Sequence, residues 1–203
     1  IIKNLSLGFD PSLFTRKQLN IYFGNISLKP IKNNLIDEIH KNKIIKTKPF
    51  FNLSNKTAGE NFKSKITKIT KILKINKVDY LFISAPENVA WLLNIRGNDN
   101  PNSPLPNCRL IIGKNKEIFL LASKQKTSNI IKNKKLKTNQ IIPVNKFANL
   151  INILNGNKFI VDEESCSLLN EEIISKKFSI INKKDPCYKL KSIKNSSEIK
   201  HMI

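Results

Sequence analysis

Residues 78–99 read VDYLFISAPENVAWLLNIRGND, and this stretch predicts a strand, a helix and a loop in succession. The run from Val78 to Ser84 is short, apolar and rich in aromatic and branched side chains, which is typical of a buried strand. Pro86 near the start of the next apolar segment predicts a helix over 86–93, because proline is tolerated in a first helical turn. The polar segment 94–107, with three prolines, predicts a long loop.

The segments on either side extend this pattern into an alternation of helices and strands. Upstream, a helix over 59–76 is predicted because Phe62, Ile66, Ile69 and Leu73 share one face, with lysines facing water between them. Downstream, the runs 109–112 and 117–121 bracket a polar turn and predict a β-hairpin. Predicted helices at 123–133, 146–155 and 165–175 then alternate with predicted strands at 140–144, 158–161 and 178–182. The expected fold class is α/β, with a mixed β-sheet flanked by helices.

The first 58 residues are less regular. Asp10-Pro11-Ser12 predicts the cap of a helix within 10–26. A short extended piece at 28–31 and one or two helical turns at 33–39 should follow. Residues 40–58 are rich in lysine and asparagine and are interpreted as a linker.

The composition is strongly basic. The 203 residues include 36 Lys+Arg against 15 Asp+Glu, a formal net charge of +21. Only three of the basic residues are arginines, namely Arg16, Arg96 and Arg109. Because isoleucine, lysine and asparagine have A/T-rich codons, their abundance is interpreted mainly as the mark of an AT-rich genome. Phosphate-binding surfaces favour arginine for its paired donors, so we expect no sequence-specific nucleic-acid partner.

The chain lacks the usual signatures of a catalytic or metal site. His40, His201 and the three cysteines (Cys108, Cys166 and Cys187) are too dispersed for a zinc site or a disulfide framework, which favours reduced thiols and a cytoplasmic location. No apolar run approaches the roughly 18 residues of a membrane span. The pairs Glu163-Glu164 and Glu171-Glu172 are interpreted as solvated structural carboxylates. We therefore expect no catalytic residue and no metal ligand in this segment.

One string departs from the lysine bias and holds the only tryptophan. Arg96 predicts a position that needs a planar, multi-donor cation, either in a substrate pocket or at the C-terminal end of a helix, and the sequence leaves both open. Trp91 is expected to fill the core. Gly97 is expected to adopt a backbone conformation that other residues resist.

The string Ala90–Asp99, followed by Ser103-Pro104, resembles the middle domain of the three-domain Xaa-Pro aminopeptidases. Further landmarks of that family occur in the same order: Gly8–Pro11, Asn33–Ile39, Ala58–Glu60 followed by a helix with Lys65, and Leu190–Asn195 with Glu198-Ile199. The chain departs from the family pattern where His40 replaces a common tryptophan, at Asn98 and Asn100, and at 105–107. These departures concern the shape of the loop.

The resemblance implies a domain organisation and a function. Residues 1–27 would end a first domain, 28–58 would be a linker, and 59–185 would form the creatinase/prolidase N-terminal-type middle domain. Residues 186–203 would be a linker helix into a pita-bread catalytic domain beyond Ile203. That domain would hold two divalent metals, usually manganese, and remove the residue that precedes proline at the N-terminus of short peptides. The resemblance gives His201 no ligand role.

In such an enzyme this segment would be non-catalytic and would wall and restrict the mouth of the active site. The loop 94–107 would face the cleft, with Asn94, Arg96 and Asp99 as substrate-pocket candidates and Trp91 and Gly97 as structural residues. Partners would be the chain's own catalytic domain and a second copy in a homodimer, with no membrane. Two alternatives stay open: a non-enzymatic pita-bread relative that binds proteins or peptides, as in a histone-chaperone subunit, and a lysine-rich nucleic-acid-binding module.

Overall fold

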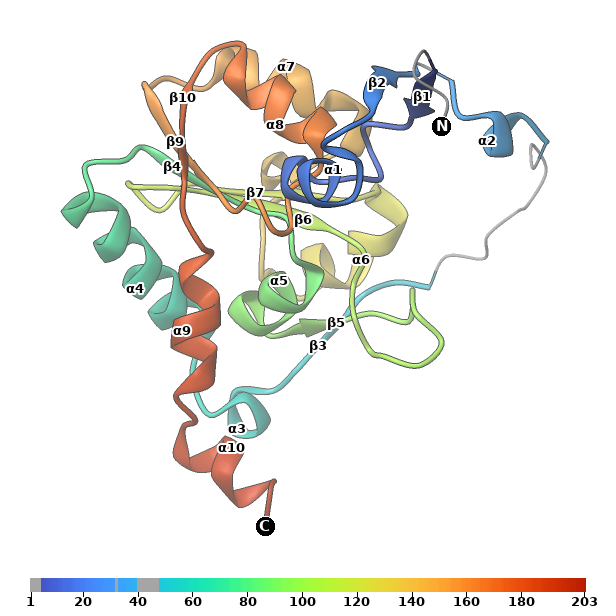
Figure 1. The fold of residues 1–203 in the computed structure, drawn as a ribbon. Coiled ribbons are helices and arrows are strands. Elements are labelled where there is room, and N and C mark those ends of the chain that lie inside the picture. The colour runs from blue at the N-terminus through green and yellow to red at the C-terminus, as the bar shows by residue number, and fades with distance from the viewer. Residues whose placement is uncertain (1–4, 32, 40–47) are drawn as a thin grey trace.

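A six-stranded mixed sheet organises the structure, a computed structural model that describes residues 5–31, 33–39 and 48–203 (Figure 1). The strand order is β10 (Ser179–Asn182), β9 (Lys158–Val161), β4 (Tyr80–Ile83), β6 (Arg109–Gly113), β7 (Ile118–Leu121) and β8 (Ile141–Ile142). The pairs β10–β9, β9–β4 and β7–β8 are parallel, whereas β4–β6 and β6–β7 are antiparallel. The predicted mixed sheet and the predicted hairpin are confirmed.

Strand β4 lies between β9 and β6 in the sheet, and apolar groups cover both of its faces. Alternate residues of a strand point to opposite faces. Leu81 and Ile83 join the core that contains helices α4 (Phe62–Ile75) and α5 (Pro86–Leu93), whereas Tyr80 and Phe82 join the core on the other face. All four side chains are buried, which explains why this run reads as continuously apolar and does not alternate.

Helices cover the two faces in separate layers (Figure 1). One face carries α4 (Phe62–Ile75), α5 (Pro86–Leu93), α6 (Lys124–Lys132) and α9 (Pro186–Ser192), and the other carries α7 (Phe147–Ile153) and α8 (Leu168–Ser175). The predicted apolar face of α4 is confirmed, since Ile66, Ile69 and Leu73 are buried and Phe62 packs beside them. The expectation that the lysines of this helix all face water is wrong, because Lys65 is only 1% exposed. Among the described residues, no helix is both long and apolar enough to cross a membrane.

The N-terminal residues form a small βαβ unit with its own apolar cluster. Strands β1 (Ser6–Phe9) and β2 (Ser27–Pro30) are parallel and are joined by α1 (Arg16–Phe23). Helix α1 begins later than predicted, because Thr15 provides the cap and completes a capping box with Gln18. Asp10 instead accepts a hydrogen bond from the Ser12 backbone N–H within a turn. The predicted turns at 33–39 correspond to α2 (Leu35–Ile39); His40 lies outside the described residues.

Two segments differ from their predicted structure: the linker at 28–58 and the helix at 186–203. Within the predicted linker, and outside its undescribed part at 40–47, β3 (Phe51–Asn52) pairs with β5 (Ile95–Arg96), and α3 (Asn55–Ala58) follows. The predicted linker helix over 186–203 is two helices, α9 and α10 (Ser196–Lys200). The break begins at Ile193, which is extended, and Asn195 then caps α10 in a capping box with Glu198. The strand predicted at 140–144 is short, since 3-10 turns at Thr138–Gln140 and Val144–Lys146 flank it.

Candidate functional site at the end of helix α5

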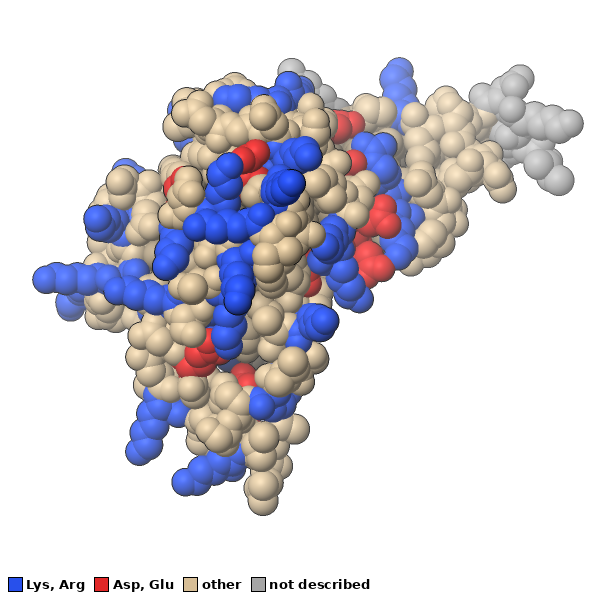
Figure 2. All heavy atoms as spheres, turned by 90° about the vertical axis from the view of Figure 1, so that its left-hand side faces the viewer, with Lys and Arg blue, Asp and Glu red and all other residues tan. Residues whose placement is uncertain are grey.

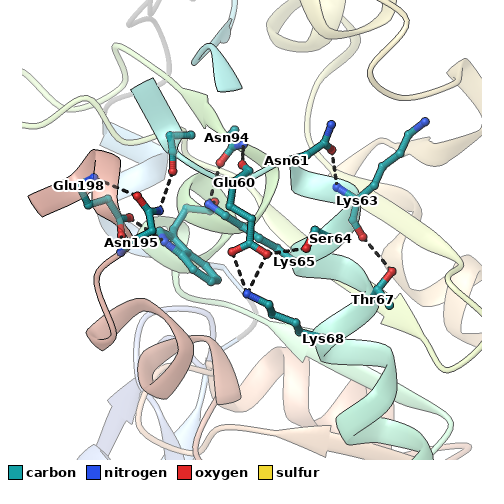
Figure 3. A network of polar contacts seen from close by, with 12 residues as sticks. Glu60, Asn61, Lys63, Ser64, Lys65, Thr67, Lys68, Asn94, Asn195 and Glu198 are labelled. Carbon is teal, nitrogen blue, oxygen red and sulfur yellow. Dashed lines mark hydrogen bonds and ion pairs between the residues drawn. The ribbon is translucent and has the colours of Figure 1, made fainter. Parts of the chain in front are cut away.

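Asn94 ends helix α5 in a left-handed conformation, with φ 50° and ψ 50°. Asparagine adopts this conformation more readily than most residues, and its side chain remains free to form hydrogen bonds. The Asn94 Nδ2 donates to the Glu60 carbonyl at 2.7 Å, and its Oδ1 accepts from Lys65 Nζ at 2.8 Å (Figure 3). Asn94 therefore joins the end of α5 to the start of α4.

Lys65 reaches the same helix end from α4. Its Nζ also donates to the carbonyl of Trp91 at 2.9 Å and lies 4.2 Å from the centroid of the indole ring. Burial lowers the pKa of Lys65 to about 8, although the nearby carboxylates of Glu198 and Glu60 oppose that effect. The ammonium thus lies at the partly negative end of the helix, where it gives the Trp91 carbonyl a shorter hydrogen bond than the one at 3.4 Å from the Asn94 N–H.

Two further cations donate to carbonyls at or just beyond this end. Arg96 Nη1 donates to the carbonyl of Ala90 at 3.2 Å and to that of Ile95 at 2.8 Å. Lys135 Nζ donates to the carbonyl of Leu93 at 2.8 Å and to that of Asn94 at 2.9 Å. Burial lowers the pKa of Arg96, and it lowers that of Lys135 to about 8. The structure therefore supports the interpretation of Arg96 as a residue of a helix C-terminus.

A pocket of about 300 Å³ opens beside this helix end. It lies between helices α3, α4, α5 and α10. Its lining consists of Leu53, Thr57, Ala58, Lys65, Trp91, Asn94, Arg96, Lys194, Glu198, His201 and Met202. Basic side chains, one carboxylate and an indole thus share one cavity, which can hold an anionic or amide group beside an apolar one.

Helix α10 closes one side of this pocket through contacts with α3. Asn195 Nδ2 donates to the Ala58 carbonyl at 3.0 Å, and Ser197 Oγ donates to the Lys56 carbonyl at 2.6 Å. Gly59 ends α3 with φ 71°, and a Cβ there would collide with the Asn195 side chain. Glycine is therefore required at Gly59 both by its conformation and by the close approach of α10.

The predicted site residues separate into two groups. Asn94 and Arg96 line the pocket, whereas Asp99 does not. Asp99 Oδ1 forms an ion pair with Lys126 at 2.8 Å, and its Oδ2 accepts from the Asn107 backbone N–H at 2.6 Å. Asp99 therefore ties the loop 94–107 to α6 and does not join Asn94 and Arg96 at the pocket.

Gly97 is needed for a reason different from the predicted one. Its φ lies outside the left-handed region, but a Cβ would lie 2.7 Å from Pro106 Cα. The Gly97 N–H donates to the Pro104 carbonyl at 3.1 Å. The two ends of the loop thus run so close together that no side chain fits between them.

Trp91 is a wall of the pocket. The expectation that Trp91 fills the core is wrong, because the indole is half-buried and packs against the edge of the main core. Its Nε1 donates to Glu198 Oε1 at 3.4 Å. The side chains of α5 that fill the core are instead those of Val89, Leu92 and Leu93.

The sequence interpretation named Lys65 and Glu198 only as family landmarks and assigned neither of them, nor Lys135, to the site. A signal existed for Lys65, since it lies three residues after Phe62 and beside Ile66, on the apolar face of α4. A lysine at such a position is buried only when carbonyls or carboxylates can receive its ammonium. No comparable local signal identifies Lys135 or Glu198, because both meet the site through long-range packing.

A second buried network orients α9 against α5. Asn88 Nδ2 donates to Asp185 Oδ2 at 2.8 Å, and Asn88 Oδ1 accepts from Lys191 Nζ at 2.8 Å. The Asp185 backbone N–H donates to Asp162 Oδ2 at 2.8 Å. Burial raises the pKa of Asp185, so its hydrogen bonds are needed to keep the carboxylate charged.

The three cysteines and Glu171, which could carry chemistry elsewhere, are buried in this structure. Burial raises the pKa of the Cys166 thiol to about 12 and also raises that of Cys108 and Cys187, so none is a ready thiolate. Glu171, expected to be solvated, is buried and pairs with Arg16 at 2.8 Å. Across the described residues, no group of three or more His, Cys, Asp or Glu side chains is placed to hold a metal ion.

Comparison with known proteins identifies the fold. In sequence, the chain is 25% identical over 129 residues to a probable Xaa-Pro aminopeptidase P of Coprinopsis cinerea, covering 60% of this chain and 21% of that protein. It is 31% identical over 108 residues to a probable Xaa-Pro aminopeptidase P of Fusarium vanettenii, covering 49% of this chain and 17% of that protein. The chain thus spans about a fifth of the length of these relatives.

The structural match covers the whole chain. A crystal structure of X-prolyl aminopeptidase from Caenorhabditis elegans, described as a cytosolic enzyme with a di-nuclear active site, superposes with a TM-score of 0.80. It is 22% identical, and the match covers 100% of this chain and 35% of that one. The family model of the creatinase/prolidase N-terminal domain matches residues 41–198. The chain therefore belongs to the creatinase/prolidase N-terminal domain family.

Proposed function

We propose that this chain is the non-catalytic N-terminal portion of a metal-dependent Xaa-Pro aminopeptidase. The observation that carries the proposal is the match of all 203 residues, at a TM-score of 0.80, to an X-prolyl aminopeptidase of which they span 35%. The two fungal relatives that carry the same activity in their names support it independently in sequence. The substrates would be short peptides with proline at the second position.

In this proposal the chain shapes the entrance to a catalytic domain and does not perform the chemistry. Two divalent metal ions, manganese by family resemblance, would activate the attacking water in that domain. The described residues do not fit such a metal pair, since they hold no suitable cluster of ligands. Helices α9 and α10, oriented by the Asn88 network and by α3, would set the position of the catalytic domain.

The pocket beside α5 is the proposed point of contact with the peptide. Only Nη1 of Arg96 is engaged, and its Nε and Nη2 form no hydrogen bond with described residues. Those two nitrogens are a pair of parallel donors that suits a peptide carbonyl or carboxylate. Asn94 would contribute by holding the end of α5, and Trp91 by providing an apolar wall.

The loop 94–107 would wall the mouth of the active site and restrict it to short peptides. It is held at two places, by the close contact of Gly97 with Pro106 and by the Asp99–Lys126 ion pair. A loop fixed at both ends can exclude large substrates without a change of conformation. The proposed enzyme acts in the cytoplasm, and a homodimer is compatible with it.

The test uses the full-length protein with manganese and an Xaa-Pro tripeptide. We expect proline-dependent release of the first residue, and none from the 203-residue chain alone. Arg96→Lys should lower kcat/KM roughly tenfold, about 1.4 kcal/mol, with little change in melting temperature. Arg109→Lys, the same change on β6, is the matched control and should leave kcat/KM unchanged.

The outcomes separate the two parts of the proposal. Absence of any proline-dependent cleavage by the full-length protein would contradict the peptidase and support a non-enzymatic relative. Normal cleavage with unchanged kinetics in Arg96→Lys would retain the peptidase and leave Arg96 as a structural residue of the α5 terminus.

A further inference from the structure

A second cavity, of about 350 Å³, is unusually rich in lysine. It lies between the start of α4, the turn between β6 and β7, and the segment after α6. Three separate parts of the chain contribute ammonium groups to it, and no Asp or Glu is part of its lining. The lysines are Lys63, Lys116, Lys134, Lys135 and Lys137.

These charges have no counter-ion within the described protein. Lys63, Lys116, Lys134 and Lys137 are exposed and form no ion pair with a described carboxylate. Elsewhere lysines do find such partners, as Lys114 does with Asp79 at 2.7 Å. Like charges around one concave surface raise the local potential and favour a multiply charged anion.

The floor of the cavity is apolar. Ile66, Ile118 and Leu136 are buried beneath it, and Phe62 is half-buried at its side. The Lys135 ammonium lies 5.4 Å from the centroid of the Phe62 ring and is itself held by carbonyls at the end of α5. The cavity thus combines a fixed cation and an aromatic face with four exposed lysines.

Basic side chains are also common on the surface outside this pocket. Figure 2 shows lysine and arginine side chains over much of one face of the molecule, with few acidic side chains among them. That distribution agrees with a general excess of positive charge. The lysine pocket differs because five lysines line one cavity of small-molecule size.

We infer that the lysine pocket binds a polyphosphate group, either free or as part of a small molecule such as a nucleotide. Lysine binds phosphate as a point charge and does not need the paired geometry of arginine. A nucleic-acid strand is the less suitable ligand, because it needs cations along an extended track and not around one cavity. The inference does not depend on the proposed peptidase activity.

The test measures the binding of tripolyphosphate and of ATP to the full-length protein by calorimetry at physiological salt. The pocket variant combines Lys116→Gln, Lys134→Gln and Lys137→Gln, all at exposed positions, so that the fold is retained. The matched control removes the same charge at three other exposed positions, by Lys71→Gln, Lys74→Gln and Lys176→Gln. Melting temperatures of both variants verify folding.

We expect saturable binding that weakens at least tenfold in the pocket variant and less than about twofold in the control. Tighter binding of ATP than of tripolyphosphate would show that the apolar floor holds the rest of the ligand, whereas equal binding would identify the phosphates alone as the recognised group. The inference is overturned if neither probe saturates the wild-type protein, or if both variants lose binding equally. Preference for single-stranded DNA over ATP at equal phosphate concentration would also overturn it.

Discussion

Replacing Lys65 by methionine tests whether a buried ammonium holds the end of α5. The substitution keeps an unbranched stem of similar length and removes only the charge and its hydrogen bonds. Asn94 Oδ1 would then lose its donor, and the Trp91 carbonyl would keep the Asn94 backbone N–H at 3.4 Å but lose its shorter bond to the ammonium. An unsatisfied buried acceptor costs about 1–3 kcal/mol and the lost hydrogen bond to the Trp91 carbonyl about 1 kcal/mol, so the gross loss is roughly 2–4 kcal/mol.

This loss is partly offset at neutral pH. The pKa of Lys65 is about 8 in the folded protein against 10.5 as the ordinary value, which shows that burial disfavours the charged form. The difference corresponds to about 3 kcal/mol, and we expect roughly 1–2 kcal/mol of it because the pocket admits water. The net destabilisation by Lys65→Met at pH 7 should therefore be about 1–3 kcal/mol.

The pH dependence gives the sharper result. Between about pH 8 and 10.5 the unfolded chain still binds the Lys65 proton and the folded chain does not, so the free energy of unfolding of the wild type rises with pH. Methionine cannot contribute this rise. The destabilisation caused by Lys65→Met should thus grow by roughly 1–2 kcal/mol from pH 7 to pH 10.

Urea unfolding followed by circular dichroism at the two pH values measures this difference. Lys71→Met makes the same change at an exposed position of the same helix and should stay within about 0.5 kcal/mol of the wild type at both. A destabilisation by Lys65→Met that is constant, or that shrinks as the pH rises, would refute the reasoning.

Three further substitutions test the supports of the site. Gly97→Ala should cost about 1–3 kcal/mol in urea unfolding, because its Cβ would press on the Pro106 backbone, and a neutral result would show that the loop can move apart. Asp99→Asn should cost roughly 1–2 kcal/mol and speed proteolysis within 94–107 as the contact with Lys126 is lost; an unchanged cleavage rate would argue against that anchor. Asn88→Ala should lower the free energy of unfolding by about 1–3 kcal/mol, unless water replaces the buried amide.

Features that depend only on residues close together in the sequence could be predicted from the sequence. The apolar run at 78–84 must be buried wherever it packs, which is why β4 was predicted together with its hairpin neighbours β6 and β7. The spacing on α4 identifies its inward face for the same reason. The Trp91–Gly97 string also indicated the place of the candidate site, since two of the three predicted pocket residues line the cavity there.

The partners of polar side chains could be known only from the tertiary structure. Lys65 is buried because α5 ends where its ammonium can reach the Trp91 carbonyl and Asn94 Oδ1. Asp99 meets Lys126 because the loop folds back onto α6. Trp91 stands at the pocket because α10 brings Glu198 to its indole. Burial of an apolar side chain needs only some apolar neighbour, so local patterns specify it. A buried charge needs one particular partner at hydrogen-bond distance, and only the packing of distant segments supplies that partner.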